Sequence, residues 1–138
     1  FWGGWVVMSA AIVATMAACG GDGGGGSPTA PGGGGSGGSG SPGPVGATIT
    51  IQGGRVNPAQ VTVSVGQSVN FVNSDGTTRN VSSDPHPIHT DCPQINVVGN
   101  LANGQSRATN AFTQARTCGF HNHDDPDNDN FKGRIVIQ

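Results

Sequence analysis

The sequence predicts one small all-β domain in the C-terminal two thirds of a 138-residue chain. Three observations lead to this class. Val, Ile and Phe alternate with polar residues in short runs, Gly and Asn-Pro turn signals separate those runs, and no segment of this part has helical periodicity. Alternation with period two places every second side chain on one face, so these faces must supply the core.

The strand pattern can be followed along the chain in order. Ile49 and Ile51 alternate before a Gly53-Gly54 turn, and a valine-rich run follows Asn57-Pro58. A Gly66-Gln67 turn precedes the next run. The expected strands are Ala47–Gln52, residues 61–65, Ser68–Asn73, Ser106–Phe112, Ala115–Phe120 and Lys132–Gln138. About seven such strands with regular turn signals are typical of a β-sandwich.

The segment before the domain is predicted to be a targeting signal followed by a tether. Residues 1–18 are apolar or small and uncharged, which indicates a signal peptide or membrane anchor. The run Met16-Ala17-Ala18-Cys19 resembles the lipobox of bacterial lipoproteins, and that resemblance implies lipidation of Cys19. An uncleaved membrane anchor remains the alternative. Both alternatives predict a location in the cell envelope, on the periplasmic or extracellular side, where disulfides are permitted.

Residues 19–46 are expected to form a disordered linker behind Cys19. Fifteen of the 25 glycines lie between Gly20 and Gly46, together with serine and proline, and such a chain behaves as a flexible coil. The domain is therefore predicted at 47–138. The net charge is −2 without a basic cluster, which argues against nucleic acid as a partner.

The stretch from Ile49 to Asn73, ITIQGGRVNPAQVTVSVGQSVNFVN, resembles the opening of a cupredoxin, and the final GRIVIQ resembles the end of that family's last strand. The resemblance implies a Greek-key β-sandwich of about seven to eight strands. It also implies a copper site, which in the plastocyanin and azurin superfamily uses two His, a Cys and a Met. In this alignment Arg79 stands at the first histidine and Asn122 at the cysteine, and no methionine follows. A second alignment uses the C-x-x-H spacing of Cys118 and His121 and predicts an electron-transfer copper protein.

The histidines carry the main functional prediction. All four lie in two short motifs, SDPHPIHTDCP and CGFHNH, which the resemblance brings to one end of the sandwich. Three or four neutral imidazoles suit copper best and zinc next. Aspartates flank both motifs and are predicted to orient the rings: Asp84, Asp91 and Asp124. The predicted metal ligands are His86, His89, His121 and His123, with Cys118 as the alternative ligand.

Cys92 and Cys118 each adjoin a histidine motif, so we expect them to form a disulfide. It would close a loop of about 26 residues and contribute about 3 kcal/mol. If Cys118 is instead a copper thiolate, Cys92 stays free. The run of aspartates from Asp124 to Asp129 lacks the glycine and final acidic residue of an EF-hand, and a solvated turn is preferred to a calcium site.

The sequence therefore predicts a membrane-tethered, cupredoxin-fold domain that binds copper through histidines and is not an enzyme. Its expected role is copper handling, or that of an accessory to an envelope complex. The expected partners are the membrane, through the lipid at Cys19, and an envelope protein. Two alternatives remain: an electron carrier that uses Cys118 and His121, and a metal-free structural or interaction domain on the cell surface.

Overall fold

The computed structural model describes residues 40–138, and within this range the chain forms nine β-strands, one 3₁₀ turn and no α-helix. The all-β prediction is confirmed, with nine strands where seven to eight were expected. The strands are β1 (Val45–Gln52), β2 (Arg55–Asn57), β3 (Gln60–Val63), β4 (Ser68–Asn73), β5 (Arg79–Ser83), β6 (Gly99–Leu101), β7 (Ser106–Ala108), β8 (Arg116–Asn122) and β9 (Gly133–Ile137), and the 3₁₀ turn η1 is Asp129–Phe131.

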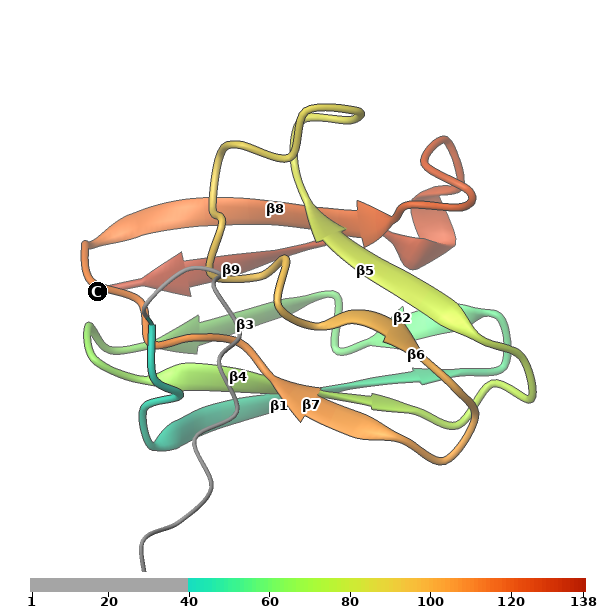
Figure 1. Cartoon of the computed structure of the whole chain (residues 1–138), viewed down its shortest axis with the longest axis horizontal. Coiled ribbons are helices and arrows are strands. Elements are labelled where there is room, and N and C mark those ends of the chain that lie inside the picture. Colours follow the sequence, from blue (N-terminus) through green and yellow to red (C-terminus); the bar gives the residue numbers. More distant parts are fainter. Residues whose placement is uncertain (1–39) are drawn as a thin grey trace, which may run out of the picture. The chain divides into compact units, whose positions relative to one another are not determined.

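The strands form two sheets that pack face to face. One has the order β2-β1-β4-β7 and the other the order β3-β9-β8-β5-β6. In Figure 1 the first sheet lies below, and β8, β9 and β5 lie above it. The pairs β1–β4 and β3–β9 are parallel, and consecutive strands such as β4 and β5 lie in different sheets. The chain therefore crosses repeatedly between sheets, as in a Greek-key sandwich.

The predicted alternation builds the core. Ile49 and Ile51 of β1 are buried, as is Phe71 of β4. The Phe71 ring meets the Phe120 ring of β8 edge to face, with centroids 5.1 Å apart and planes at 84°. This contact joins the two sheets, and edge-to-face pairs add about 0.5–1.5 kcal/mol beyond the apolar area they bury. Because Phe120 points into the core, the residues beside it on β8 point to the outer face of the five-stranded sheet.

Of the six predicted strands, Ser68–Asn73 has the predicted bounds and four others shift by one or two residues at an end. The strand expected over Ser106–Phe112 ends at Ala108, because the side-chain Oγ1 of Thr109 accepts from the Val69 N–H at 3.1 Å in place of a backbone carbonyl. The strand expected to end at Phe120 continues to Asn122, where it pairs with β5. This extension matters for the site, since it places His121 on a strand. Strands β2, β5 and β6 were not predicted, because each contains only one Val, Ile, Leu or Phe and therefore shows no alternation.

The first strand begins two residues before position 47, where the domain was predicted to start. β1 starts at Val45, and the end of the predicted linker is bonded to the sandwich: the Ser41 and Pro44 carbonyls accept from the backbone N–H groups of Ala111 and Ser68. The predicted signal segment, Cys19 and most of the linker lie outside the described residues. Residues 40–138 contain no helix long and apolar enough to cross a membrane.

Candidate metal centre

The four histidines come together in one cluster. Each of them offers a ring nitrogen, and these four nitrogens all lie within 4.8 Å of one another. Two rings belong to the segment after β5 and two to the end of β8, so the structure unites residues about 35 positions apart in sequence. In the part of the chain that the structure describes, no other group of three or more His, Cys, Asp or Glu side chains converges in this way.

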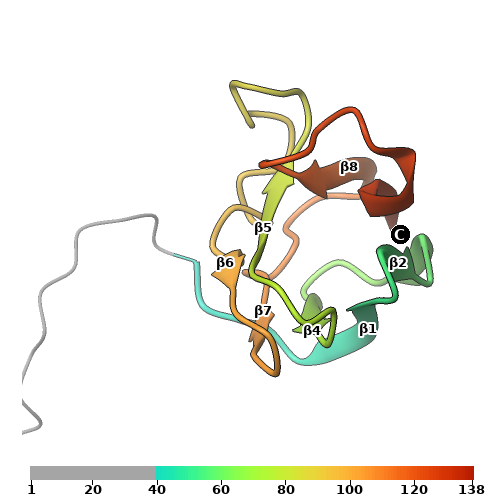
Figure 2. The ribbon, with the colours of Figure 1, turned by 90° about the vertical axis from the view of Figure 1, so that its right-hand side faces the viewer.

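The cluster lies over the outer face of β8 and β5. His121 follows the core residue Phe120 on β8 and therefore points away from the core. It is nevertheless only 2% exposed, because the segment of residues 84–91 folds over it. Figures 1 and 2 both show this segment projecting beyond β5, on the side away from β1 and β4. The two histidine motifs do meet, but over a sheet face, whereas the sequence predicted one end of the sandwich.

Asp84 holds the buried His121 ring. The ring Nδ1 lies 2.7 Å from Asp84 Oδ1, so Nδ1 donates its proton and the lone pair is left on Nε2. Gly119, two residues before His121 on the same face, makes room for this carboxylate, since a Cβ there would stand 2.0 Å from Asp84 Oδ2. The backbone N–H of Asp84 also donates to the Gly119 carbonyl at 3.1 Å. The sequence predicted an orienting role for Asp84, but nothing in it singled out Gly119.

His89 is held in a conformation that other residues must enforce. Its φ of +51° is left-handed, which costs a side-chain-bearing residue about 1–2 kcal/mol. Four hydrogen bonds fix it. Its N–H donates to Pro85 O at 2.8 Å, and its ring Nδ1 donates to Ser83 O at 2.7 Å. Its carbonyl accepts from Ser83 Oγ at 3.0 Å and from Asn96 Nδ2 at 2.8 Å. Strained backbone fixed by several bonds is typical of functional sites.

The remaining two rings, those of His123 and His86, lie beside the first two. His123 Nδ1 lies 2.8 Å from His89 Nε2, and the His123 backbone N–H donates to Asn80 O at 2.7 Å. The His86 ring is exposed, and its centroid is 5.1 Å from that of His123 and 5.6 Å from that of His121. Partial loss of contact with water lowers the pKa of His86, and the charges of the other three rings lower it further. The neutral form, which ligates metals, is thereby favoured.

These residues fit a metal ion bound by imidazoles. His89 and His121 both spend Nδ1 on a protein acceptor, which turns Nε2 of each toward the cluster. His121 Nε2 is buried without a hydrogen-bond partner, which is costly unless something binds it. Nitrogens that bind one ion at about 2.1 Å are no more than about 4.2 Å apart, so four nitrogens within 4.8 Å of one another need only a small contraction to share an ion.

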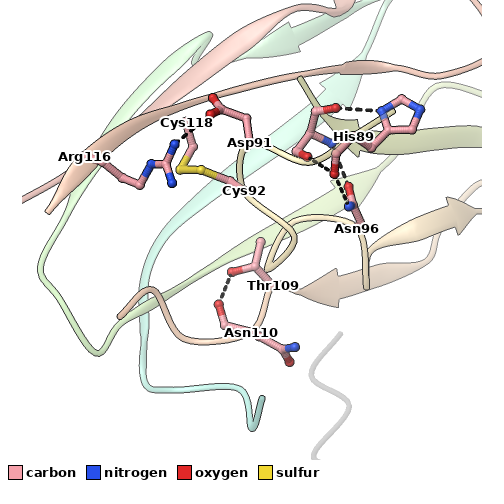
Figure 3. The surroundings of a disulfide bond; sticks show 9 residues. His89, Asp91, Cys92, Asn96, Thr109, Asn110, Arg116 and Cys118 are labelled. Atoms are coloured by element: carbon pink, nitrogen blue, oxygen red, sulfur yellow. Dashed lines mark hydrogen bonds and ion pairs between the residues drawn. A yellow bond between two sulfur atoms is a disulfide. The ribbon is translucent and has the colours of Figure 1, made fainter. Parts of the chain in front are cut away.

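The predicted disulfide between Cys92 and Cys118 is present. Figure 3 shows it beside the ion pair of Asp91 with Arg116, with His89 further along the same segment. The disulfide ties the end of the histidine segment to β8. Cys118 is fully buried and lies three residues before His121, so the two side chains project from opposite faces of the strand. Cys118 is therefore not placed to share a ligand set with His121, and its sulfur is already bonded.

The positions that the cupredoxin resemblance assigns to a blue-copper site hold structural groups. Arg79 binds Asp75 through Nε at 2.8 Å and stacks on the Phe131 ring at 4.2 Å. The backbone N–H of Gly54 lowers the pKa of Asp75, and Arg79 lowers it further against the opposing effect of burial. Asn122 is buried and accepts from the Asn80 N–H at 2.9 Å. These groups satisfy one another and leave no ligand set there.

The aspartate run forms a turn with internal bonds. Asn128 caps η1, Lys132 Nζ donates to Asp129 at 2.8 Å, and Asn128 Nδ2 donates to Asp125 at 2.8 Å. The side chains are exposed, as expected for a solvated turn. Of the other aspartates predicted to orient rings, Asp91 binds Arg116 instead, and Asp124 has no hydrogen bond to a ring within residues 40–138. Ser83 and Asn96, which do hold His89, carry no sequence signal beyond their polarity.

Solved structures share this fold. The protein is similar to a purple cupredoxin from Nitrosopumilus maritimus, with 16% identity and a TM-score of 0.52 over 67% of this chain and 99% of that one. It is similar to amicyanin from Paracoccus versutus, with 18% identity and a TM-score of 0.54 over 67% and 81%. It is also similar to a mutant fern plastocyanin, with 17% identity and a TM-score of 0.53 over 66% and 99%. No family model and no curated protein matches the sequence. The fold is therefore cupredoxin-like.

Proposed function

We propose that this protein is a membrane-tethered metal-binding protein that holds one copper ion through His86, His89, His121 and His123. Its role would be copper handling, or that of an accessory to an envelope complex, and it would bind metal rather than catalyse a reaction. The observation that carries the proposal is the buried His121 Nε2, which has no partner and belongs to the four-nitrogen cluster. A protein does not retain such a group without compensation elsewhere, and a metal ion would supply it.

Copper is favoured over zinc by the ligand set. Four neutral imidazoles suit both ions, and divalent copper binds a given nitrogen site more tightly than zinc does. A thiolate ligand would favour monovalent copper. Residues 40–138 offer none, because both of their cysteines are in the disulfide. The cupredoxin-like fold supports copper as well, since the similar solved structures include plastocyanin and amicyanin.

The tether is proposed from the sequence alone. The lipobox-like run ending at Cys19 and the glycine-rich segment after it support a lipid anchor with a flexible leash. A disulfide in the domain agrees with an oxidising compartment such as the periplasm or the cell exterior. Labelling with a radioactive fatty acid in a bacterial host, in wild type and in Cys19→Ser, tests this part. Incorporation in both or in neither would remove the anchor from the proposal.

The competing role, an electron carrier with a Cys118 ligand, is disfavoured by two observations. The Cys118 sulfur is bonded to Cys92, and its side chain faces the core while His121 faces outward. The other alternative, a domain without metal, leaves the orphaned His121 nitrogen unexplained.

Equilibrium competition for Cu(II) tests the proposal, in a Cys19→Ser background that removes the one thiol outside the disulfide. We expect one Cu(II) per chain, Zn(II) bound more weakly, and a loss of at least tenfold in copper affinity for His121→Ala. Ile88→Ala, which changes an exposed side chain of the same segment, is the matched control and should keep the wild-type affinity. An unchanged affinity in His121→Ala would sink the shared site, and failure to bind any Cu(II) would favour the metal-free alternative.

A further inference from the structure

The four histidines differ in how firmly the protein holds them. His121 is buried and bonded to Asp84, and His89 is fixed by four hydrogen bonds. His123 is held through its backbone N–H, which donates to Asn80, and its ring Nδ1 lies 2.8 Å from His89 Nε2. These three rings rest on the sheet or on each other. Their orientation is set before any ligand arrives, so little rotamer freedom is lost when they bind a metal.

His86 lacks this support. The described residues give its ring no hydrogen bond, and it is exposed between Pro85 and Pro87, which are exposed too. Its ring centroid lies 5.1–5.6 Å from the other three, and the His89 centroid lies 4.8 Å from that of His123 and 5.1 Å from that of His121. The sheet lies beneath His121, so His86 is the member of the cluster that faces solvent.

The backbone of the histidine segment is fixed while the His86 side chain is not. The Asp91 N–H donates to Asp84 O at 2.9 Å, and the His89 N–H donates to Pro85 O. These two bonds join the beginning of the histidine segment to its end. The disulfide holds its end. The adjacent prolines limit the backbone further. His86 therefore leaves the cluster by rotating its side chain, without opening of the segment.

We infer that His89, His121 and His123 form a fixed three-nitrogen metal site and that His86 is an exchangeable fourth ligand, whose place an external imidazole donor takes when metal is loaded or released. This inference rests on the proposed function and adds the route by which that site exchanges its metal. A displaced His86 gives an incoming donor direct access from solvent, while the inner three ligands keep hold of the ion. Such a site suits transfer of metal more than permanent retention.

The test uses the full chain in the Cys19→Ser background, loaded with one equivalent of Cu(II), and compares His86→Ala with His121→Ala. Free imidazole is titrated into each variant and followed by EPR. We expect His86→Ala to retain copper with a loss of no more than about tenfold in affinity, to take up one imidazole, and to regain the wild-type spectrum. His121→Ala should lose more affinity and should not be restored, because its pocket is covered by the segment above it.

A second readout is the rate at which a chelator removes copper from wild type with and without imidazole. We expect imidazole to accelerate removal from wild type several-fold, and Ile88→Ala, the control for the segment, to behave as wild type. If wild type binds copper but His86→Ala loses as much affinity as His121→Ala, or shows no response to imidazole, the inference is wrong and the proposed function stands. If wild type binds no copper, both fail.

Discussion

Gly119→Ala isolates the contribution of a single carboxylate to the histidine cluster. The new methyl group would stand 2.0 Å from Asp84 Oδ2 and 2.9 Å from its Cγ. An ordinary carbon–oxygen contact is about 3.3 Å, so the carboxylate must move by about 1.3 Å. A shift of that size carries the 2.7 Å bond to His121 Nδ1 toward about 4 Å, where it no longer counts as a hydrogen bond.

The affinity for metal should fall while the fold survives. Loss of a hydrogen bond that orients a ligating histidine lowers metal affinity by about 10–100-fold, which is about 1.4–2.8 kcal/mol. The Asp84 side chain is 48% exposed and can rotate away, and alanine is about as well suited to a strand as glycine or better. The unfolding free energy of the metal-free protein should fall by about 1–3 kcal/mol, because the shift leaves the buried Nδ1–H of His121 without its partner.

A double-mutant cycle tests this reasoning, with copper affinity measured by competition and stability by urea unfolding. Asp84→Ala should lower the affinity by a similar factor, and adding Gly119→Ala to it should change nothing more, because the clash has lost its target. Thr117→Ala, an exposed residue on the same strand, is the control. Wild-type affinity in Gly119→Ala, or additive losses in the double variant, would refute the proposed role of Asp84.

Three further predictions concern the supports of the site and the fold. Asn96→Ala removes the side chain that joins Ser83 N to His89 O and should lower copper affinity by roughly tenfold. Asn100→Ala, which changes an exposed asparagine on β6, is the control and should have no effect. Equal copper affinities in the two variants would contradict this prediction. Replacing Cys92 and Cys118 by serine opens a 26-residue loop and should lower the unfolding free energy by about 3.5 kcal/mol. Denaturant unfolding measures this loss. Unchanged stability would show that the disulfide does not restrict the unfolded chain. Asp75→Asn should destabilise the protein by about 2 kcal/mol at pH 7. Because the pKa of Asp75 is lowered in the folded state, its stabilisation is present above the unfolded value of about 3.9 and is lost as the pH falls through the folded pKa. Urea unfolding at pH 7 and pH 3 should show the difference between wild type and variant shrink, and a constant difference would argue against the ion pair as its source.

The sequence predicted the fold where the pattern repeats. Ile49, Ile51 and Phe71 alternate with polar residues over long enough runs to reveal their buried face. The three- to five-residue strands β2, β5 and β6 gave no such signal, and their place is set by pairing with longer neighbours. β7 also ends at Ala108, where the Thr109 side chain accepts from the Val69 N–H, although the sequence pattern continues.

The members of the site were easier to predict than its position. The two histidine motifs were visible because no other histidine occurs in the chain. Their place over a sheet face depended on β8 reaching Asn122, since only then does His121 alternate with Phe120. Ser83 and Asn96 support His89 because the fold brings β5 and the segment after Cys92 beside it, and Gly119 supports Asp84 through the space that its missing side chain leaves. Neither kind of support has a pattern in one sequence.

The central claim is that the protein binds copper through histidine nitrogens and not through a cysteine. The most direct measurement is the visible and EPR spectrum of the Cys19→Ser protein after one equivalent of Cu(II). We predict a weakly coloured complex with large copper hyperfine splitting and nitrogen couplings, and no strong thiolate charge-transfer band. An intense visible band with narrow hyperfine splitting would mean that Cys118 ligates the metal, and that result would contradict the all-histidine centre.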